Sequence, residues 1–160
     1  MNKNLDYKAG EIMLIREATW DDRRALWEWY HDSLRYKTFR SRQPDKEYEQ
    51  HTIWFNQLMK NPDIVLCIGI DDNLRVGCVR FDHEQEDVYH LNFFLKPLYC
   101  GREYSIHLLR EAINYLNRIQ TPKKIVVDVQ LDSPNVAIQR MFEILGFSFV
   151  NYRGELNLEV

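Results

Sequence analysis

Residues 91–109 read LNFFLKPLYCGREYSIHLL: an apolar run, then a loop that contains Pro97, then a helical pattern. The periodicity predicts a strand over 88–95 and a helix over about 102–118. The N-terminus of a helix presents backbone N–H groups that have no partner within the helix, and these groups attract anions. The stretch therefore predicts a strand within a sheet, followed by a helix start where a phosphate group can bind.

The residues before this stretch read as a strand, two helices and a hairpin. Thr19 is of the residue type that favours a helix N-cap, and Asp21 and Asp22 in the next turn favour the helix dipole. We expect, in order, a strand over 13–17, helices over 20–37 and 46–60, strands over 64–70 and 75–82 joined by a turn at 71–73, and a polar turn at 83–87.

The residues after this stretch alternate between strands and a helix. Thr121 and Pro122 break the chain, and Gly146 ends a second helical pattern. We expect a strand over 125–131, a helix over 135–145, and strands over 147–152 and 155–160 around a turn at Arg153 and Gly154. The order β-α-α-β-β-β-α-β-α-β-β favours an α/β fold, a mixed sheet with helices on both faces. We expect one domain over 11–160, after a polar arm over 1–10.

The composition argues against several classes of function. The 160 residues carry a formal net charge of −3 and no long basic run, so we expect no nucleic-acid partner. No run approaches ~20 apolar residues, so we expect no membrane span and a cytoplasmic setting. Cys67, Cys78 and Cys100 are too widely spaced for a disulfide framework or a zinc motif, and we expect no metal. Cys67 and Cys78 lie in apolar runs and are expected to be buried.

Two segments carry a resemblance to a known family. Residues 135–147, NVAIQRMFEILGF, resemble the C-terminal helix of the GCN5-related N-acetyltransferase (GNAT) superfamily, which starts at an Asn and ends in Leu-Gly-Phe. Residues 91–109 resemble its strand, Pro-x-Tyr loop and pyrophosphate-binding helix. The resemblance covers about residues 12–158. It implies the GNAT fold, a mixed, mostly antiparallel central sheet with helices on both faces, and an N-acetyltransferase that uses acetyl-CoA.

The resemblance also implies which residues contact acetyl-CoA. The backbone of the central strand would pair with the pantetheine arm and polarise the thioester carbonyl. The helix start would bind the pyrophosphate, and the C-terminal helix would approach the pantetheine arm. The implied cofactor-binding residues are Phe93, Phe94, Leu95, Gly101, Arg102, Glu103, Tyr104, Ser105, Ile106, Asn135 and Phe142.

The pyrophosphate motif departs from the family pattern. Cys100 stands where the family has Gln or Arg, Glu103 where it has Gly, and Ser105 at the last small position. A carboxylate a few Å from a pyrophosphate costs on the order of 1 kcal/mol or more. Gly101 would allow close approach of the backbone, and Arg102 would supply a cation.

The predicted strand over 88–95 carries a candidate catalytic pair, His90 and Asn92. The two residues share one face of the strand, opposite its apolar residues. Histidine titrates near neutrality, so His90 is a candidate base for the substrate ammonium; the alternative is a histidine that only packs or faces solvent. The resemblance places Phe142 where the family has a Tyr general acid. Water, Tyr104 or no dedicated acid would then protonate the thiolate.

Short motifs upstream suggest the substrate. They are Trp29 with Asp32, Ser33 and Arg35, then His51-x-x-Trp54, then Gly77-x-x-Arg80-x-Asp82. They are similar to motifs of GNAT enzymes that acetylate the free amine of nucleotide-linked amino sugars, including those of the pseudaminic-acid pathway. This similarity implies that Arg35, Arg80 and Asp82 bind substrate. The alternative for Arg80 and Asp82 is a salt-bridged sheet face. Arg35 and His51 could meet a sugar or phosphate, but for His51 we favour a position that faces solvent.

Three functions remain open at this point. The leading hypothesis is an N-acetyltransferase for a small amine, a nucleotide-linked amino sugar, acting as a monomer or homodimer. Arg35, Arg40 and Arg42 favour an anionic substrate over the peptide of a protein or ribosomal-protein N-acetyltransferase. The third hypothesis is a degenerate GNAT domain that binds without turnover.

Overall fold

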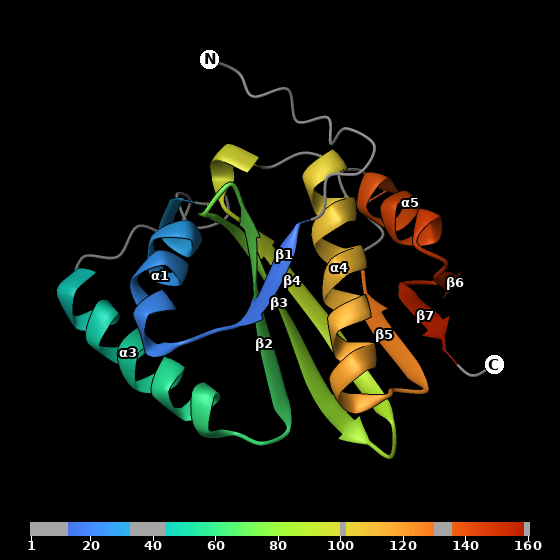
Figure 1. Cartoon of the computed structure of the whole chain (residues 1–160), viewed down its shortest axis with the longest axis horizontal. Coiled ribbons are helices and arrows are strands. Elements are labelled where there is room, and N and C mark those ends of the chain that lie inside the picture. Colours follow the sequence, from blue (N-terminus) through green and yellow to red (C-terminus); the bar gives the residue numbers. More distant parts are fainter. Residues whose placement is uncertain (1–12, 33–43, 100–101, 130–135, 159–160) are drawn as a thin grey trace.

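The computed structural model describes residues 13–32, 44–99, 102–129 and 136–158. Within these ranges the chain forms one seven-stranded sheet in the order β1-β2-β3-β4-β5-β7-β6 (Figure 1). The strands are β1 Leu14–Glu17, β2 Ile64–Asp71, β3 Leu74–Gln85, β4 Val88–Leu95, β5 Lys124–Asp128, β6 Ser148–Val150 and β7 Arg153–Asn157. Neighbouring strands are antiparallel except β4 and β5, which are parallel.

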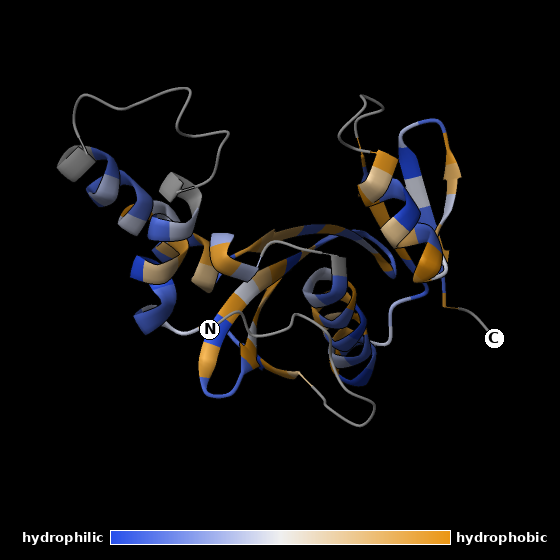
Figure 2. Ribbon diagram, turned by 90° about the horizontal axis from the view of Figure 1, so that it is seen from above, coloured by the Kyte–Doolittle hydropathy of each residue, from blue (hydrophilic) through white to orange (hydrophobic). Residues whose placement is uncertain are grey.

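The helices lie on both faces of the sheet. They are α1 Arg23–Asp32, α3 Pro44–Lys60, α4 Arg102–Gln120 and α5 Val136–Ile144, with short 3-10 turns η1 Trp20–Asp22 and η2 Pro97–Tyr99. Helices α1 and α3 lie on one face and α4 and α5 on the other (Figures 1 and 2). Helix α4 carries the chain across the sheet, which is why β4 and β5 are parallel. The predicted mixed, mostly antiparallel sheet with helices on both faces is confirmed.

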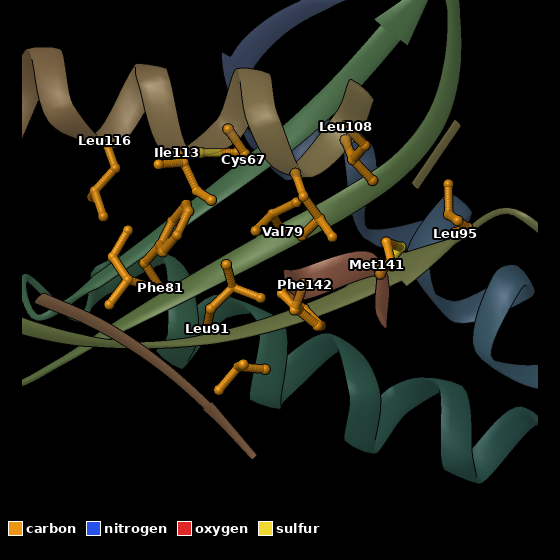
Figure 3. Packing of buried hydrophobic residues seen from close by; sticks show 14 of the residues in the cluster. Cys67, Val79, Phe81, Leu91, Leu95, Leu108, Ile113, Leu116, Met141 and Phe142 are labelled. Carbon is orange, nitrogen blue, oxygen red and sulfur yellow. The ribbon is translucent and has the colours of Figure 1, made fainter. Parts of the chain in front are cut away.

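The larger hydrophobic core lies between the sheet and helices α4 and α5. Leu108 and Leu116 of α4 are fully buried against Phe81 and Leu91 of the central strands, and Phe142 of α5 closes the cluster (Figure 3). A smaller cluster between the sheet and α3 is centred on Phe55, Leu58, Leu66, Ile68 and Cys78. No described helix combines the length and apolar character that crossing a membrane requires.

The first predicted helix and the first hairpin differ from the prediction at their ends. The chain enters the helix through η1, and α1 begins only at Arg23. Residues 33–37 of the predicted helix lie outside the described residues. Strand β3 continues through most of the predicted turn at 83–87, because it pairs with β4 as far as Gln85. The chain reverses at Glu86, whose φ is 50°.

The C-terminal hairpin also turns at a different place. The predicted turn at Arg153 and Gly154 is wrong, because β7 begins at Arg153 and the chain reverses at Asn151, whose φ is 56°. Asparagine is one of the few non-glycine residues that adopt this left-handed conformation readily. Gly154 has a packing role instead, since a Cβ there would meet the Phe149 ring at 2.5 Å. Strand β5 ends at Asp128, before the predicted limit of 131.

Asp22 is a fully buried carboxylate that joins β1, the entry to α1 and β3. It accepts hydrogen bonds from both Nη atoms of Arg16 at 2.7 and 2.8 Å, from Nε of Arg75 at 2.7 Å and from the backbone N–H of Thr19 at 2.7 Å. Burial by itself would raise the pKa of Asp22, but the bonds from Arg16, Thr19 and Arg75 outweigh it and lower the pKa to about 2. This network holds the start of α1 against the sheet.

We expect Asp22→Asn to lower the free energy of unfolding by about 2 kcal/mol at pH 7, because folding lowers the pKa of this carboxyl group to about 2. The pKa of the folded state lies below that of the unfolded chain. The stabilisation is therefore complete above the unfolded pKa of about 4 and is lost as the pH falls toward 2. Urea unfolding of wild type and variant at pH 7 and at pH 3 measures this. Asp21→Asn, at the exposed neighbouring position, is the matched control. A difference between wild type and Asp22→Asn that stays constant over this pH range would contradict the assignment.

Candidate active site

The central feature of the candidate site is a fork between β4 and β5. The two parallel strands pair from Val88 with Lys124 to His90 with Val126. Beyond His90, β4 pairs only with β3 in the described part of the chain, while β5 continues beside β7 to Asp128. The sheet therefore opens immediately after His90, and one edge of β4 borders the fork.

The backbone of β4 presents donors to the fork. In an antiparallel pair, alternate residues exchange both of their backbone hydrogen bonds with the partner strand. The N–H of Lys96 donates to the carbonyl of Val76 at 2.9 Å, so the even-numbered residues of β4 face β3. Phe93 and Leu95 therefore direct their N–H groups away from β3, into the fork. A backbone N–H in such a place needs water or a ligand as its acceptor.

A polar row crosses β3 and β4 on the sheet face that α1 and α3 share. In the register, Arg80 lies opposite Asn92 and Asp82 lies opposite His90, so all four side chains project from the same face. Nε of Arg80 donates to Oδ1 of Asp82 at 2.6 Å. The predicted catalytic pair and the predicted substrate pair thus lie side by side. The salt bridge foreseen as the alternative for Arg80 and Asp82 is present, and both side chains remain 30% exposed.

His90 makes a side-chain bond to β5 at the apex of the fork, where the two strands begin to separate. Its Nε2 lies 2.9 Å from Oδ2 of Asp128, and its Nδ1 lies 3.4 Å from Nδ2 of Asn92. Arg153 of β7 donates from Nε to Oδ1 of the same carboxylate at 3.1 Å. Burial would raise the pKa of Asp128, but the bonds from Arg153 and His90 lower it below its ordinary value.

Sequence reasoning missed Asp128 and Arg153 as site residues. Asp128 ends an apolar strand, which was a usable signal, because a carboxylate at such a position needs a partner. Arg153 carried no signal, because it was placed in a turn. Its contact with Asp128 depends on the antiparallel pairing of β5 with β7, which brings these two residues into register.

An apolar pocket of about 330 Å³ lies next to the polar row. Its walls come from α1, α3 and the paired residues Cys78 and Phe94, one step along the strands from Arg80 and Asn92. The residues that line it are Leu26, Trp29, His51, Trp54, Cys78 and Phe94. None of these is acidic.

The prediction that His51 faces solvent is wrong. Its Nε2 lies 3.0 Å from the carbonyl oxygen of Arg23, and its ring lies among those of Trp27, Tyr48 and Trp54. This bond ties α3 to α1 beside the pocket. The pocket therefore has a wall of aromatic rings whose positions are fixed by contacts between the two helices.

The cysteine thiols in this region are inert. Cys67 and Cys78 are buried as predicted, and burial raises the pKa of each thiol to about 12. A thiolate at these positions is therefore not populated near neutral pH. The described residues also contain no cluster of three or more His, Cys, Asp or Glu side chains placed to hold a metal ion. The chemistry of the face rests on His90 and its polar neighbours.

The family described as "Acetyltransferase (GNAT) domain" matches residues 13–148. This chain belongs to the GNAT acetyltransferase family. The predicted family and the predicted class of enzyme, an N-acetyltransferase, are confirmed. No curated protein matches the chain.

Solved structures of N-acetyltransferases and of one further domain share the fold. A chimera of the spermidine N-acetyltransferase SpeG from Vibrio cholerae and hSSAT is 16% identical, with a TM-score of 0.75 over 92% of this chain and 96% of that one. The N-acetyltransferase PseH from Campylobacter jejuni is 12% identical, with a TM-score of 0.72 over 93% and 100%. A domain from Methanocaldococcus jannaschii is 23% identical, with a TM-score of 0.68 over 91% and 98%.

The residues of this GNAT chain fit acetyl-CoA at two places. The fork offers the N–H groups of Phe93 and Leu95, whose directions suit the amide groups of an extended pantetheine arm. The start of α4 offers the N-terminus of a 19-residue helix, where the helix dipole favours an anion. Glu103 is exposed there, so its carboxylate faces solvent, where water screens its repulsion. Ser105 is buried, and Ile106 is half-buried.

The aromatic residues predicted at the cofactor site have core contacts. Tyr104 is buried, its ring packs on Tyr99, and its hydroxyl donates to Oδ2 of Asp71 at 3.2 Å. The hydroxyl is therefore occupied at the β2–β3 hairpin. Phe142 is fully buried. Its ring and that of Phe93 pack in a T-shaped arrangement, with 5.8 Å between the ring centroids. Phe142 therefore packs behind the fork, whereas Tyr104 belongs to the core near the β2–β3 hairpin.

Some predicted site residues lie outside the described residues. These are Arg35, Cys100, Gly101 and Asn135. Arg102 is the first residue of α4, and only its backbone is described. Their roles remain predictions.

The fork predicts an alternating pattern of amide hydrogen exchange along β4. We expect the N–H groups of Phe93 and Leu95 to exchange at least about tenfold faster than those of Asn92 and Phe94, because only the latter face β3. Hydrogen exchange followed by NMR on the free protein measures all four. Asn92 and Phe94 serve as internal controls, since they lie on the same strand. Uniform protection along 92–95 would mean that β4 is paired on both edges and that the fork is closed in solution.

Proposed function

We propose that this GNAT enzyme transfers an acetyl group from acetyl-CoA to the free amine of a small molecule, and that the molecule is a nucleotide-linked amino sugar. The observation that carries the proposal is the fork, with two backbone donors on one side and His90 at its apex. A thioester carbonyl beside Phe93 would have a hydrogen-bond donor in place for the negative charge that develops on its oxygen. The amine would approach from the face that carries His90 and Asn92.

The proposed reaction needs one base and one proton source. The substrate ammonium gives a proton to His90, because only the neutral amine has a lone pair. The amine nitrogen then bonds to the acetyl carbon of acetyl-CoA, and the bond from that carbon to sulfur breaks. The nitrogen then releases its second proton to water, and the coenzyme A thiolate takes up one proton from water. Tyr104 is bound to Asp71 and Phe142 has no acidic proton, so neither supplies it.

The lining of the pocket favours an amine that sits on a planar or apolar skeleton. The pocket between α1 and α3 is walled by Trp29, His51, Trp54 and Phe94. Such rings stack on sugar faces and nucleobases. A polyamine such as spermidine carries several positive charges and would require carboxylates, but no described residue lining this pocket is acidic. The SpeG structures therefore share the fold of this chain without supplying its substrate.

Arg80 supplies a cation beside this pocket. It lies on β3 next to Cys78, which lines the pocket, and only its Nε is committed to Asp82. Its Nη groups extend from a side chain that is 30% exposed. They are suited to a phosphate or to a sugar hydroxyl. This arrangement supports an anionic substrate over a peptide.

A non-catalytic GNAT domain is the competing hypothesis. It rests on Cys100, Glu103 and Phe142, which depart from the family pattern. The open fork and the hydrogen-bonded position of His90 favour an active enzyme instead, because a domain that only binds would not require a base at this place. The exposed position of Glu103 also reduces the expected cost to coenzyme binding.

Acetyl-CoA binding is the first test. We expect a thermal shift with acetyl-CoA and new protection of the Phe93 and Leu95 amides from hydrogen exchange. Glu103→Gln should tighten binding a few-fold, since it removes a repulsion of about 1 kcal/mol. Glu111→Gln, further along α4, is the control for a general change of charge. The absence of heat and of a thermal shift at millimolar acetyl-CoA would exclude the proposed enzyme.

The second test is catalytic. Release of free coenzyme A thiol should be greatest with a nucleotide-linked amino sugar, in a panel that includes spermidine and a peptide with a free N-terminus. With the best amine, His90→Gln should lower kcat by about 10²-fold near neutral pH. The loss should shrink at high pH, where more of the amine is already neutral. If His90→Gln keeps both the rate and the shape of the pH profile, His90 only packs and another group is the base.

A further inference from the structure

The strands that form the fork are bridged at its apex by a side-chain network that we call the fork bridge: His90 of β4, Asp128 of β5 and Arg153 of β7. It begins where the backbone pairing of β4 with β5 ends. The last pair is His90 with Val126, and Asp128 follows two residues later on the same face of β5. The exposed fractions of the three side chains rise outward, from 18% for His90 to 38% for Asp128 and 45% for Arg153. The network therefore runs from the candidate base to the solvent.

We propose that Asp128, held by Arg153, is a positioning residue that fixes the tautomer and orientation of His90, so that Nδ1 is the basic nitrogen presented to the amine. This inference rests on the proposed function, in which His90 is the base. It adds two residues that act through His90 and to which neither the resemblance nor the sequence motifs assigned a role.

The hydrogen-bond partners of His90 assign its tautomer. A carboxylate oxygen can only accept, so the contact of Nε2 with Asp128 at 2.9 Å requires a proton on Nε2. The neutral ring then has a bare lone pair on Nδ1, which faces the amide nitrogen of Asn92 at 3.4 Å. That long contact leaves Nδ1 accessible to a stronger donor. When Nδ1 takes a proton from the substrate, the adjacent carboxylate stabilises the imidazolium that forms.

Arg153 keeps Asp128 in the form that this role requires. Its Nε lies 3.1 Å from Oδ1, and Nε2 of His90 lies 2.9 Å from Oδ2, so the shortest contacts of the two partners use different oxygens of one carboxylate. The second guanidinium contact, from Nη2 to Oδ2, is longer at 3.5 Å. Arginine stays charged at every pH that the enzyme meets, so Asp128 remains an anion and an acceptor.

A purely structural bridge is the competing explanation. In that case the network would only hold β4, β5 and β7 together at the fork. Its outer members are half-exposed, and ion pairs of that kind contribute little to stability. Asp128→Asn is therefore expected to keep the fold, with a melting temperature within a few degrees of wild type. Loss of a positioning residue should change the tautomer of His90 and lower kcat, whereas loss of a purely structural contact should not do so specifically.

The matched control is Lys124→Ala. Lys124 lies on the same strand and the same face as Asp128, and its Nζ pairs with Glu155 of β7 at 3.4 Å. The variant thus removes a cross-strand ion pair between β5 and β7 without touching His90. Any loss caused only by weaker pairing of these strands should appear in both variants.

The experiment combines NMR with kinetics. In the free wild-type protein, long-range 15N–1H correlation spectra of the His90 ring should show the proton on Nε2. In Asp128→Ala the ring should become a mixture of tautomers, while Lys124→Ala should keep the wild-type pattern. With the amine that reacts fastest in the panel above, Asp128→Asn should lower kcat about tenfold or more, with KM within about twofold. Lys124→Ala should keep the wild-type kcat.

Four outcomes would overturn the inference. A proton on Nδ1 in the wild type removes its geometric basis, and this measurement needs no substrate. A normal kcat in Asp128→Asn, together with a loss in His90→Gln, leaves the base in place without a positioning residue. Equal losses in Asp128→Asn and Lys124→Ala indicate a structural bridge. If wild type transfers no acetyl group to any amine, the proposed function fails, and a tautomer on Nε2 would then belong to a structural contact.

Discussion

The two edges of β4 impose the constraint on which the rest of the site depends. One edge is paired with β3 over its whole length, and Gly77 of β3 packs so closely that a Cβ there would meet the carbonyl oxygen of Phe94 at 2.7 Å and Leu108 at 2.9 Å. The other edge is paired with β5 only as far as His90. Backbone N–H groups that lack a partner inside a protein are costly. A strand held rigidly on one side and open on the other therefore calls for a ligand or water in the fork.

The two faces of the sheet divide the work between stability and chemistry. On one face, α4 and α5 bury the odd-numbered residues of β4 in the larger core, which fixes the strand. On the other face, α1 and α3 pack on β2, β3 and Phe94 of β4, and Asn92 and Asp128 remain exposed. The buried Asp22 network holds α1 to β1 and β3, and thereby sets the position of Trp29 at the pocket. Packing on one face thus supports polar chemistry on the other.

Much of the fold could be predicted from local patterns. The strand over 88–95 and the helix that follows it have the expected bounds within two residues, because alternation and helical spacing are local properties of the chain. The same parity placed His90 and Asn92 on one face, and the register confirms this placement beside Arg80 and Asp82. The turn at Asn151 was missed because Arg153-Gly154 looked like a stronger turn signal. Packing of Gly154 under Phe149, a contact between strands, explains that glycine instead.

The sequence by itself determined the order of elements and the face of β4 that carries His90, because both follow from spacing along the chain. It also pointed to the family, through the resemblance of residues 91–109 and 135–147. Only the tertiary structure decided what His90 touches. The α4 crossover brings β5 beside β4, and the antiparallel return of β7 brings Arg153 to Asp128, over a separation of 25 residues. The point where the β4–β5 ladder ends is likewise set by packing between distant segments. Neither a strand's neighbour nor the end of a ladder leaves a periodic signal in the sequence, so the fork bridge could be found only in three dimensions.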